Sequence, residues 1–229
     1  MKQNQARFES FPWEMEIIEL EELFDVIDDF LNDEEAKNAH LRKKHPATFT
    51  ALWNRDPNQI LLDGVQTFRR QMVVLLKTYL EKIIKDFAEN VFIGTPQKMA
   101  AYLLLDEFQD AKPLGELEKI LEEGKTTTLT GLPKNAASRI MKGGLSKTLD
   151  KVKKISNAKI KTRTKTTLVK LNEIRTHIVH DVSAEEISTE FLRESFDAVR
   201  DLIVSFREVC ALNNISDVDN WEENIDASD

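Results

Sequence analysis

Residues 57–92, which read PNQILLDGVQTFRRQMVVLLKTYLEKIIKDFAENVF, predict the central element of the fold. Apolar residues recur at every third or fourth position, the spacing of one helical face. They are Leu61, Val65, Phe68, Met72, Leu75, Tyr79, Ile83, Phe87 and Val91. Asp56-Pro57 is typical of a helix start and Gly94-Thr95-Pro96 of a stop, so the helix is about 36 residues and about 54 Å long. Because its middle is apolar on more than one face, we expect it at the centre of a bundle or at a subunit interface.

Helical periodicity continues on both sides of this stretch. An amphipathic helix is expected over about 12–35, with its apolar face in the core. That face consists of Trp13, Ile17, Leu20, Phe24, Ile27 and Leu31. Shorter helices are expected over about 97–109 and 113–123, and another over the stripe that runs from Leu145 to Ile155. The polar stretch 124–144 predicts a long, mobile connection.

Two further helices lie in the C-terminal half. Leu168, Leu171, Ile174 and Ile178 predict a helix over about 164–178. Ser183, with Glu186 three residues later, has the pattern of a capping box and predicts the start of the last helix. Its apolar stripe consists of Ile187, Phe191, Val199, Leu202, Phe206 and Val209. We expect the acidic tail 214–229 to be disordered.

The composition favours an all-α fold of a single helical domain over 1–213, in which 1–56 is an acidic N-terminal extension. Only 7 Gly and 6 Pro occur in 229 residues, fewer turn formers than an all-β chain usually needs. The single cysteine excludes a disulfide framework. The chain has no run of 18 apolar residues and begins without the pattern of a signal peptide, so we expect a cytoplasmic protein with no membrane partner.

Charge is distributed unevenly along the chain. The formal net charge is −8, and residues 1–35 carry 12 acids against 2 bases. Residues 134–170 reverse this pattern, with 12 bases and only Asp150 opposing them. Such a local excess can attract a polyanion that the whole molecule repels. The alternative is a solvated basic stretch that pairs with the acidic ends of its own chain.

The segment LNEIRTHIVHDVSAEE, residues 171–186, contains the residues most able to carry chemistry. Arg175 falls about 45° from the centre of the apolar stripe of its helix, where its charge must stay solvated or find an anion. His180 is expected in the connection that precedes the Ser183 cap. On a continuous helix, Arg175 and His180 would point about 140° apart. They can then share a ligand only if the chain turns between them, which the capping box favours, or if two copies of the segment face each other.

An arginine beside a histidine is a suitable pair for metal-free cleavage of RNA. The imidazole can move the proton of a 2′-hydroxyl, and the guanidinium stabilises charge on the phosphate. The ribose itself supplies the nucleophile, so this chemistry requires no metal and no cofactor.

The segment R-T-H-I-V-H, residues 175–180, resembles the R-x(4–6)-H signature of the HEPN superfamily, helical proteins that include many metal-independent ribonucleases. The helix before the motif and the amphipathic helix after it agree with this pattern, and QMVVLLKTYLEKIIKDFAE looks like the long helix of the RiboL-PSP-like branch. The resemblance covers about residues 57–92 and 145–212. Family members often carry Asn after the motif arginine, where this chain has Thr176.

The resemblance implies a HEPN-like bundle with one very long helix, and a homodimer whose two motifs line one cleft. Arg175 and His180 would be the catalytic residues. The expected RNA contacts are Thr176, His177, Lys159, Lys161, Arg163 and Lys165. Such enzymes often act as toxins or antiphage effectors, restrained by an inhibitory partner of the antitoxin kind.

Other interpretations remain open at this level. A catalytically silent module of the same fold would bind RNA, a nucleotide or a protein, for example through its acidic N-terminal helix. Glu173, His177 and His180 have helical spacing for a metal site, although no second such unit is present. His40 and His45 are expected in an exposed basic turn. Cys210 lies on an apolar stripe and is expected to be a buried structural thiol.

Overall fold

The computed structural model describes residues 5–44, 57–103, 131–180 and 186–217. Within these residues the chain is predominantly helical, as expected of an all-α protein. The helices are α1 (Ser10–Asn32), α2 (Glu34–Lys44), α3 (Pro57–Gly94), α4 (Pro96–Leu103), α7 (Leu132–Ile140), α8 (Leu145–Ser156), α9 (Thr162–His180) and α10 (Thr189–Arg207), with a 3₁₀ turn at Ala211–Asn213. The strands β1 (Arg7–Phe8) and β2 (Ser216–Asp217) form one short parallel pair.

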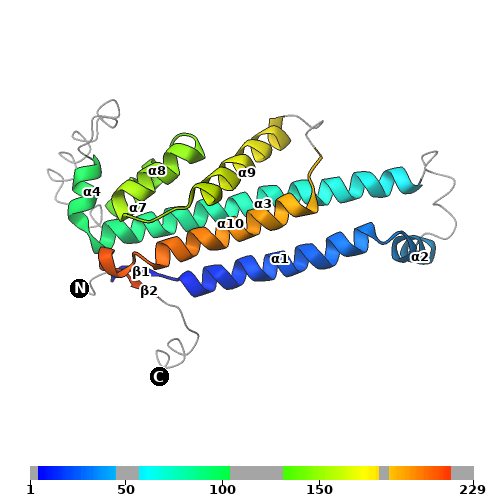
Figure 1. Cartoon of the computed structure of the whole chain (residues 1–229), viewed down its shortest axis with the longest axis horizontal. Coiled ribbons are helices and arrows are strands. Elements are labelled where there is room, and N and C mark those ends of the chain that lie inside the picture. The colour runs from blue at the N-terminus through cyan, green and yellow to red at the C-terminus, as the bar shows by residue number, and fades with distance from the viewer. Residues whose placement is uncertain (1–4, 45–56, 104–130, 181–185, 218–229) are drawn as a thin grey trace, which may run out of the picture.

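Helix α3 is the axis of an elongated bundle (Figure 1). It packs against α1, α4, α7, α8, α9 and α10. In Figure 1, α1 and α10 lie on one side of α3 and α8 and α9 on the other. The expectation of a long central helix that ends at Gly94 is therefore confirmed.

The buried face of α3 is broader than a single stripe because the helix has neighbours on several sides. Leu76, Leu80 and Ile84 are fully buried alongside the expected Ile83. Leu75, which the stripe placed inside, is instead 40% exposed. At one end of the core the Phe87 and Phe206 rings stack with centroids 3.9 Å apart, and thereby join α3 to α10.

Two stretches expected to be irregular are ordered. Within the expected connection 124–144, residues 132–140 form α7, with Ala136, Ala137 and Ile140 buried, and α7 packs against α3. Only a few apolar residues of this segment are buried, too few to produce a helical periodicity in the sequence. Residues 214–217 of the expected tail are also ordered, because Ile215 is buried and β2 pairs with β1. Residues 113–123, 124–130 and 218–229 lie outside the described part of the chain.

His40 is exposed as expected, but the expected turn around it is wrong, because His40 lies within α2. Asp33 separates α1 from α2 and caps the second helix, accepting hydrogen bonds from the backbone N–H groups of Glu35 and Ala36 at 3.0 Å each. The His40 ring contacts Phe30 edge-on, with centroids 6.0 Å apart. His45 lies outside the described residues.

The boundary between the last two helices also differs from the expectation. Helix α9 continues through His180, and α10 begins at Thr189 rather than after Ser183. Its cap is Ser188, whose Oγ accepts a hydrogen bond from the backbone N–H of Phe191 at 3.1 Å. Glu186 precedes the helix and Ser183 lies outside the described residues, so the predicted capping box does not start α10.

Candidate functional site

Helix α9 places Arg175 at its contact with α3. Leu168 and Leu171 are fully buried, and Ile174 is 7% exposed, so these residues anchor the inner side of the helix. Arg175 is half-buried on the same side. The sequence placed Arg175 about 45° from the centre of the apolar stripe. In the structure, this position lies at the edge of the core.

A second cation lies close to Arg175. Lys77 of α3 has a side chain only 5% exposed, and its Nζ donates a hydrogen bond to Oε1 of Glu81 at 2.5 Å. Burial lowers the pKa of the Lys77 ammonium, and the charge of Arg175 lowers it further, whereas Glu81 opposes both effects. The charges of Arg175 and Lys77 thus repel each other across the α3–α9 contact, where Glu81 pairs with Lys77.

Among the described residues, Arg175 forms no ion pair with a carboxylate. A half-buried guanidinium without such a partner retains donors that suit an oxyanion, and phosphate is one that it can bind in a bidentate manner. The arrangement around Arg175 and Lys77 is therefore a candidate anion site.

The structure does not turn the chain between Arg175 and His180. Both residues belong to α9, so they lie about 140° apart around one helix axis. The turn that the sequence favoured is wrong, and within one chain the two positions lie on different faces. The possibility that remains is that two copies of the segment face each other.

Thr176 and His177, expected to contact RNA, are both exposed. The Thr176 hydroxyl donates a hydrogen bond to the backbone oxygen of Asn172 at 2.8 Å, so it is engaged within its own helix. His177 lines a groove of about 650 Å³ between α8 and α9. The remaining lining residues include Ser146, Thr162, Lys165, Thr166, Lys170 and Glu173.

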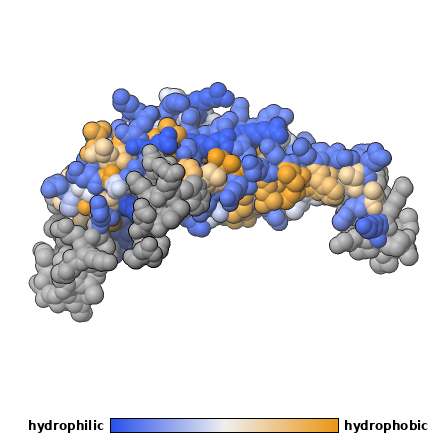
Figure 2. All heavy atoms as spheres, turned by 90° about the horizontal axis from the view of Figure 1, so that it is seen from below, coloured by the Kyte–Doolittle hydropathy of each residue, from blue (hydrophilic) through white to orange (hydrophobic). Residues whose placement is uncertain are grey.

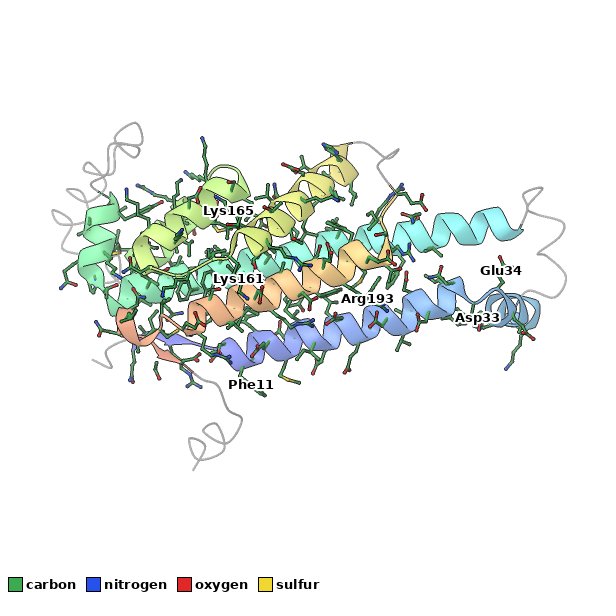
Figure 3. All side chains as sticks on the ribbon, viewed as in Figure 1. Phe11, Asp33, Glu34, Lys161, Lys165 and Arg193 are labelled. Atoms are coloured by element: carbon green, nitrogen blue, oxygen red, sulfur yellow. The ribbon has the colours of Figure 1, made fainter. Side chains whose placement is uncertain are left out.

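Three of the four basic residues expected to bind RNA are divided between two surfaces. Figure 3 shows Lys161 and Lys165 near the start of α9, Lys161 on the side of α10 and Lys165 on the side of α8. Lys161 and Arg163 pair with acids of α10, Asp201 at 3.2 Å and Glu194 at 3.6 Å.

Lys165 pairs with Asp150 of α8 at 2.6 Å, and Lys159 is exposed. Part of the basic stretch thus pairs with acids of its own chain, the alternative that the sequence left open. These pairs are solvent-accessible, and exposed ion pairs contribute only about 0–1 kcal/mol each, so a phosphate can compete for the same cations.

The acidic residues of α1 pair elsewhere. Glu14, Glu21 and Asp25 face Arg207, Arg200 and Arg193 of the antiparallel α10. The acids are seven and four residues apart on α1, and the arginines are seven residues apart on α10. Figure 3 shows Arg193 between α10 and α1. Among the described residues, then, these three acids of the N-terminal helix pair with α10 and not with the basic stretch 134–170.

Comparison with family models, curated proteins and solved structures finds no match to this chain. No described helix is long and apolar enough to cross a membrane. The described residues also contain no group of three or more His, Cys, Asp or Glu side chains able to hold a metal ion.

Sequence reasoning missed Lys77. A signal was present, because Lys77 interrupts the apolar run VVLLKTYL and precedes Glu81 by four residues, the spacing of a helical ion pair. Its proximity to Arg175, which is 98 positions later in the chain, could not be read from that signal.

Proposed function

We propose that this protein is a metal-independent endoribonuclease of the HEPN type that acts as a homodimer on RNA in the cytoplasm. One observation carries the proposal: the motif arginine, Arg175, is half-buried beside the buried Lys77 and has no carboxylate partner among the described residues. An uncompensated cation at the edge of a core is costly unless it serves to bind an anion.

The proposed reaction uses the phosphate clamp together with His180. The His180 imidazole takes the proton of the ribose 2′-hydroxyl as that oxygen attacks the adjacent phosphorus. The bond from phosphorus to the 5′-oxygen breaks, and the imidazolium returns a proton to that oxygen. Arg175 stabilises the charge that develops on the phosphoryl oxygens. The products are a 2′,3′-cyclic phosphate and a 5′-hydroxyl end.

A second copy is needed to bring the two groups together, because Arg175 and His180 lie on different faces of α9. The surface formed by α3 and Ile178 of α9 is suited to self-association. A largely apolar groove of about 580 Å³ runs along α3 to Ile178, and Leu75 at its edge is 40% exposed. Val179, which follows Ile178 in the chain, is 53% exposed. We propose that the partner subunit covers this groove and brings its His180 toward Arg175.

The basic residues of α8 and α9 would guide RNA toward the cleft. Lys165, Lys170 and His177 line the groove between α8 and α9, whereas Lys161 and Arg163 lie at the start of α9 on the side of α10, and Lys159 is exposed. Since phosphate contacts release condensed counterions, affinity should fall steeply as salt rises. A toxin or antiphage role, restrained by an inhibitory partner, follows from the same family resemblance.

A catalytically silent HEPN module is the second candidate. It is favoured by the course of α9, which separates Arg175 from His180 within one chain. In this case the cationic surface would bind RNA or a nucleotide without turnover, or the fold would bind a protein partner.

RNA cleavage in the presence of EDTA tests the enzyme. We expect wild type to cleave, Arg175→Ala and His180→Ala to lose about 10²–10⁴-fold in rate, and His40→Ala, a histidine far from the motif in sequence, to retain activity. Binding without cleavage in all four proteins would identify the silent module. Activity that EDTA abolishes would indicate metal-dependent chemistry.

Mixing the two inactive variants tests the composite site. If Arg175 and His180 come from different subunits, each mixed dimer contains one intact site, and a randomly exchanged mixture should recover about one quarter of the wild-type rate. If both residues act from one chain, the mixture stays inactive. Light scattering should give about twice 26.3 kDa, and a monomer at micromolar concentration would contradict the dimer.

A further inference from the structure

The inner and outer faces of α1 differ in how their charges are satisfied. On the inner side, Glu14, Glu21, Asp25 and Asp28 pair with Arg207, Arg200, Arg193 and Arg69. These four carboxylates are therefore committed to the fold. Ile17, Leu20 and Phe24 supply the buried apolar contacts of the same helix.

The outer face carries a second apolar stripe that remains exposed, although Phe30 at its end contacts the His40 ring of α2. Leu23, Val26 and Phe30 are 52%, 69% and 42% exposed, and their spacing of three and four residues puts them on one face. Figure 2 looks at the side on which α1 lies and shows an apolar patch along it. Large apolar side chains grouped in this way on a surface indicate an interaction site.

Carboxylates border this stripe. Glu19, Glu22 and Asp29 are exposed, and none of them forms an ion pair with another described residue. On a helix, Glu19 continues the row of Leu23 and Val26, whereas Glu22 and Asp29 lie on one flank of it. The outer face of α1, defined as Glu19, Glu22, Leu23, Val26, Asp29 and Phe30, therefore combines apolar side chains with exposed carboxylates, of which Asp29 also interacts electrostatically with Arg193 of α10.

This charge selects the kind of molecule that fits. A second copy presenting its own α1 would bring carboxylates against carboxylates, and RNA would be repelled by the same groups. A helix with an apolar stripe of matching spacing, bordered by Lys or Arg, satisfies both features at once. We propose that the outer face of α1 is a docking surface for a basic amphipathic helix of a partner protein. This inference does not depend on the ribonuclease activity.

A labelled model peptide tests the surface on the full-length protein. The probe is an 18-residue Leu/Lys helix with one apolar stripe, and the control is a peptide of the same composition scrambled to remove the stripe. Fluorescence anisotropy should show that wild type binds the striped peptide at least about tenfold more tightly than the scrambled one. Equal binding of both peptides would mean charge attraction alone and would overturn the proposal.

Protein variants locate the binding. The double variant Leu23→Ser/Phe30→Ser should weaken binding of the striped peptide at least about tenfold, and Glu19→Gln/Glu22→Gln should weaken it and reduce its salt dependence. Leu212→Ser is the control, since Leu212 is 69% exposed and belongs to the 3₁₀ turn, outside α1. Unchanged binding by the Leu23/Phe30 variant would overturn the proposal. Loss of a wild-type dimer in that variant would also overturn it, because the surface would then be a self-interface.

Discussion

Replacing Asp28 by Asn should destabilise the protein far more than the same change three residues earlier, at Asp25. The Asp28 carboxylate accepts hydrogen bonds from Arg69 Nε at 2.7 Å, from Arg69 Nη2 at 2.9 Å and from the Thr189 hydroxyl at 2.8 Å. The side chains of Arg69 and Asp28 are only 11% and 3% exposed. Arg69 also donates to the backbone oxygen of Ile187 at 3.0 Å, so this cluster holds the start of α10 against α1 and α3.

The size of the effect follows from burial. Asp28→Asn leaves the Arg69 charge buried without a counter-charge, which costs about 3–5 kcal/mol in the free energy of unfolding. For a chain of this length, that loss corresponds to a fall in Tm of roughly 6–20 °C. The Asp25–Arg193 pair has side chains 39% and 51% exposed, so Asp25→Asn should cost no more than about 1 kcal/mol.

The pH dependence of the Asp28 effect gives an independent check. Burial alone would raise the pKa of Asp28, but the hydrogen bonds from Arg69 and Thr189 and the Arg69 charge outweigh it and lower this pKa. A carboxyl whose pKa is lower in the folded state contributes stability that is complete above its unfolded pKa, about 3.9, and is lost as the pH falls through the folded value. The difference between wild type and Asp28→Asn should therefore be constant near neutrality and shrink below about pH 4.

Urea unfolding of wild type, Asp28→Asn and Asp25→Asn, followed by circular dichroism from pH 7 to pH 3, measures these quantities. A cost of Asp28→Asn that lies within about 1 kcal/mol of the Asp25→Asn cost at pH 7 would refute the reasoning. So would a difference from wild type that grows toward acid pH.

Three further predictions concern single positions. Gly94→Ala should lower the free energy of unfolding by about 1–3 kcal/mol, because the new Cβ would collide with the backbone oxygen of Asn213. Gly64 lies in open space on the same helix, so Gly64→Ala should raise the free energy of unfolding by up to about 1 kcal/mol. The same urea titration measures both variants. Ser188→Ala should cost about 1 kcal/mol through loss of the α10 cap; a thermal melt that matches wild type would contradict the assigned helix start. Burial raises the pKa of the Cys210 thiol to about 12. The native protein should therefore resist iodoacetamide at pH 8 and react once it is unfolded. Rapid labelling of the native protein would contradict this, because it would show that the thiol is accessible.

The sequence by itself determined the helices with long, regular apolar stripes. The all-α class, the extent of α3 and the inward face of α1 follow from periodicity, because each helix of this kind must bury one face whatever it packs against. The position of Arg175 near the edge of an apolar stripe was readable for the same reason. The ribonuclease proposal stays a prediction from the motif and from this environment.

Tertiary structure decided what depends on neighbours distant in the chain. The sequence offers two serines, Ser183 and Ser188, that can each cap a helix, and the local pattern does not choose between them. The helix begins after Ser188, where Leu192 and Phe196 are buried against the bundle. The few apolar residues of α7 become a helix because α3 offers a surface to cover. Lys77 lies near Arg175, and the acids of α1 meet the arginines of α10, only because antiparallel packing brings them together. Charge pairing of this kind depends on distance in space, and spacing along the chain does not carry that information.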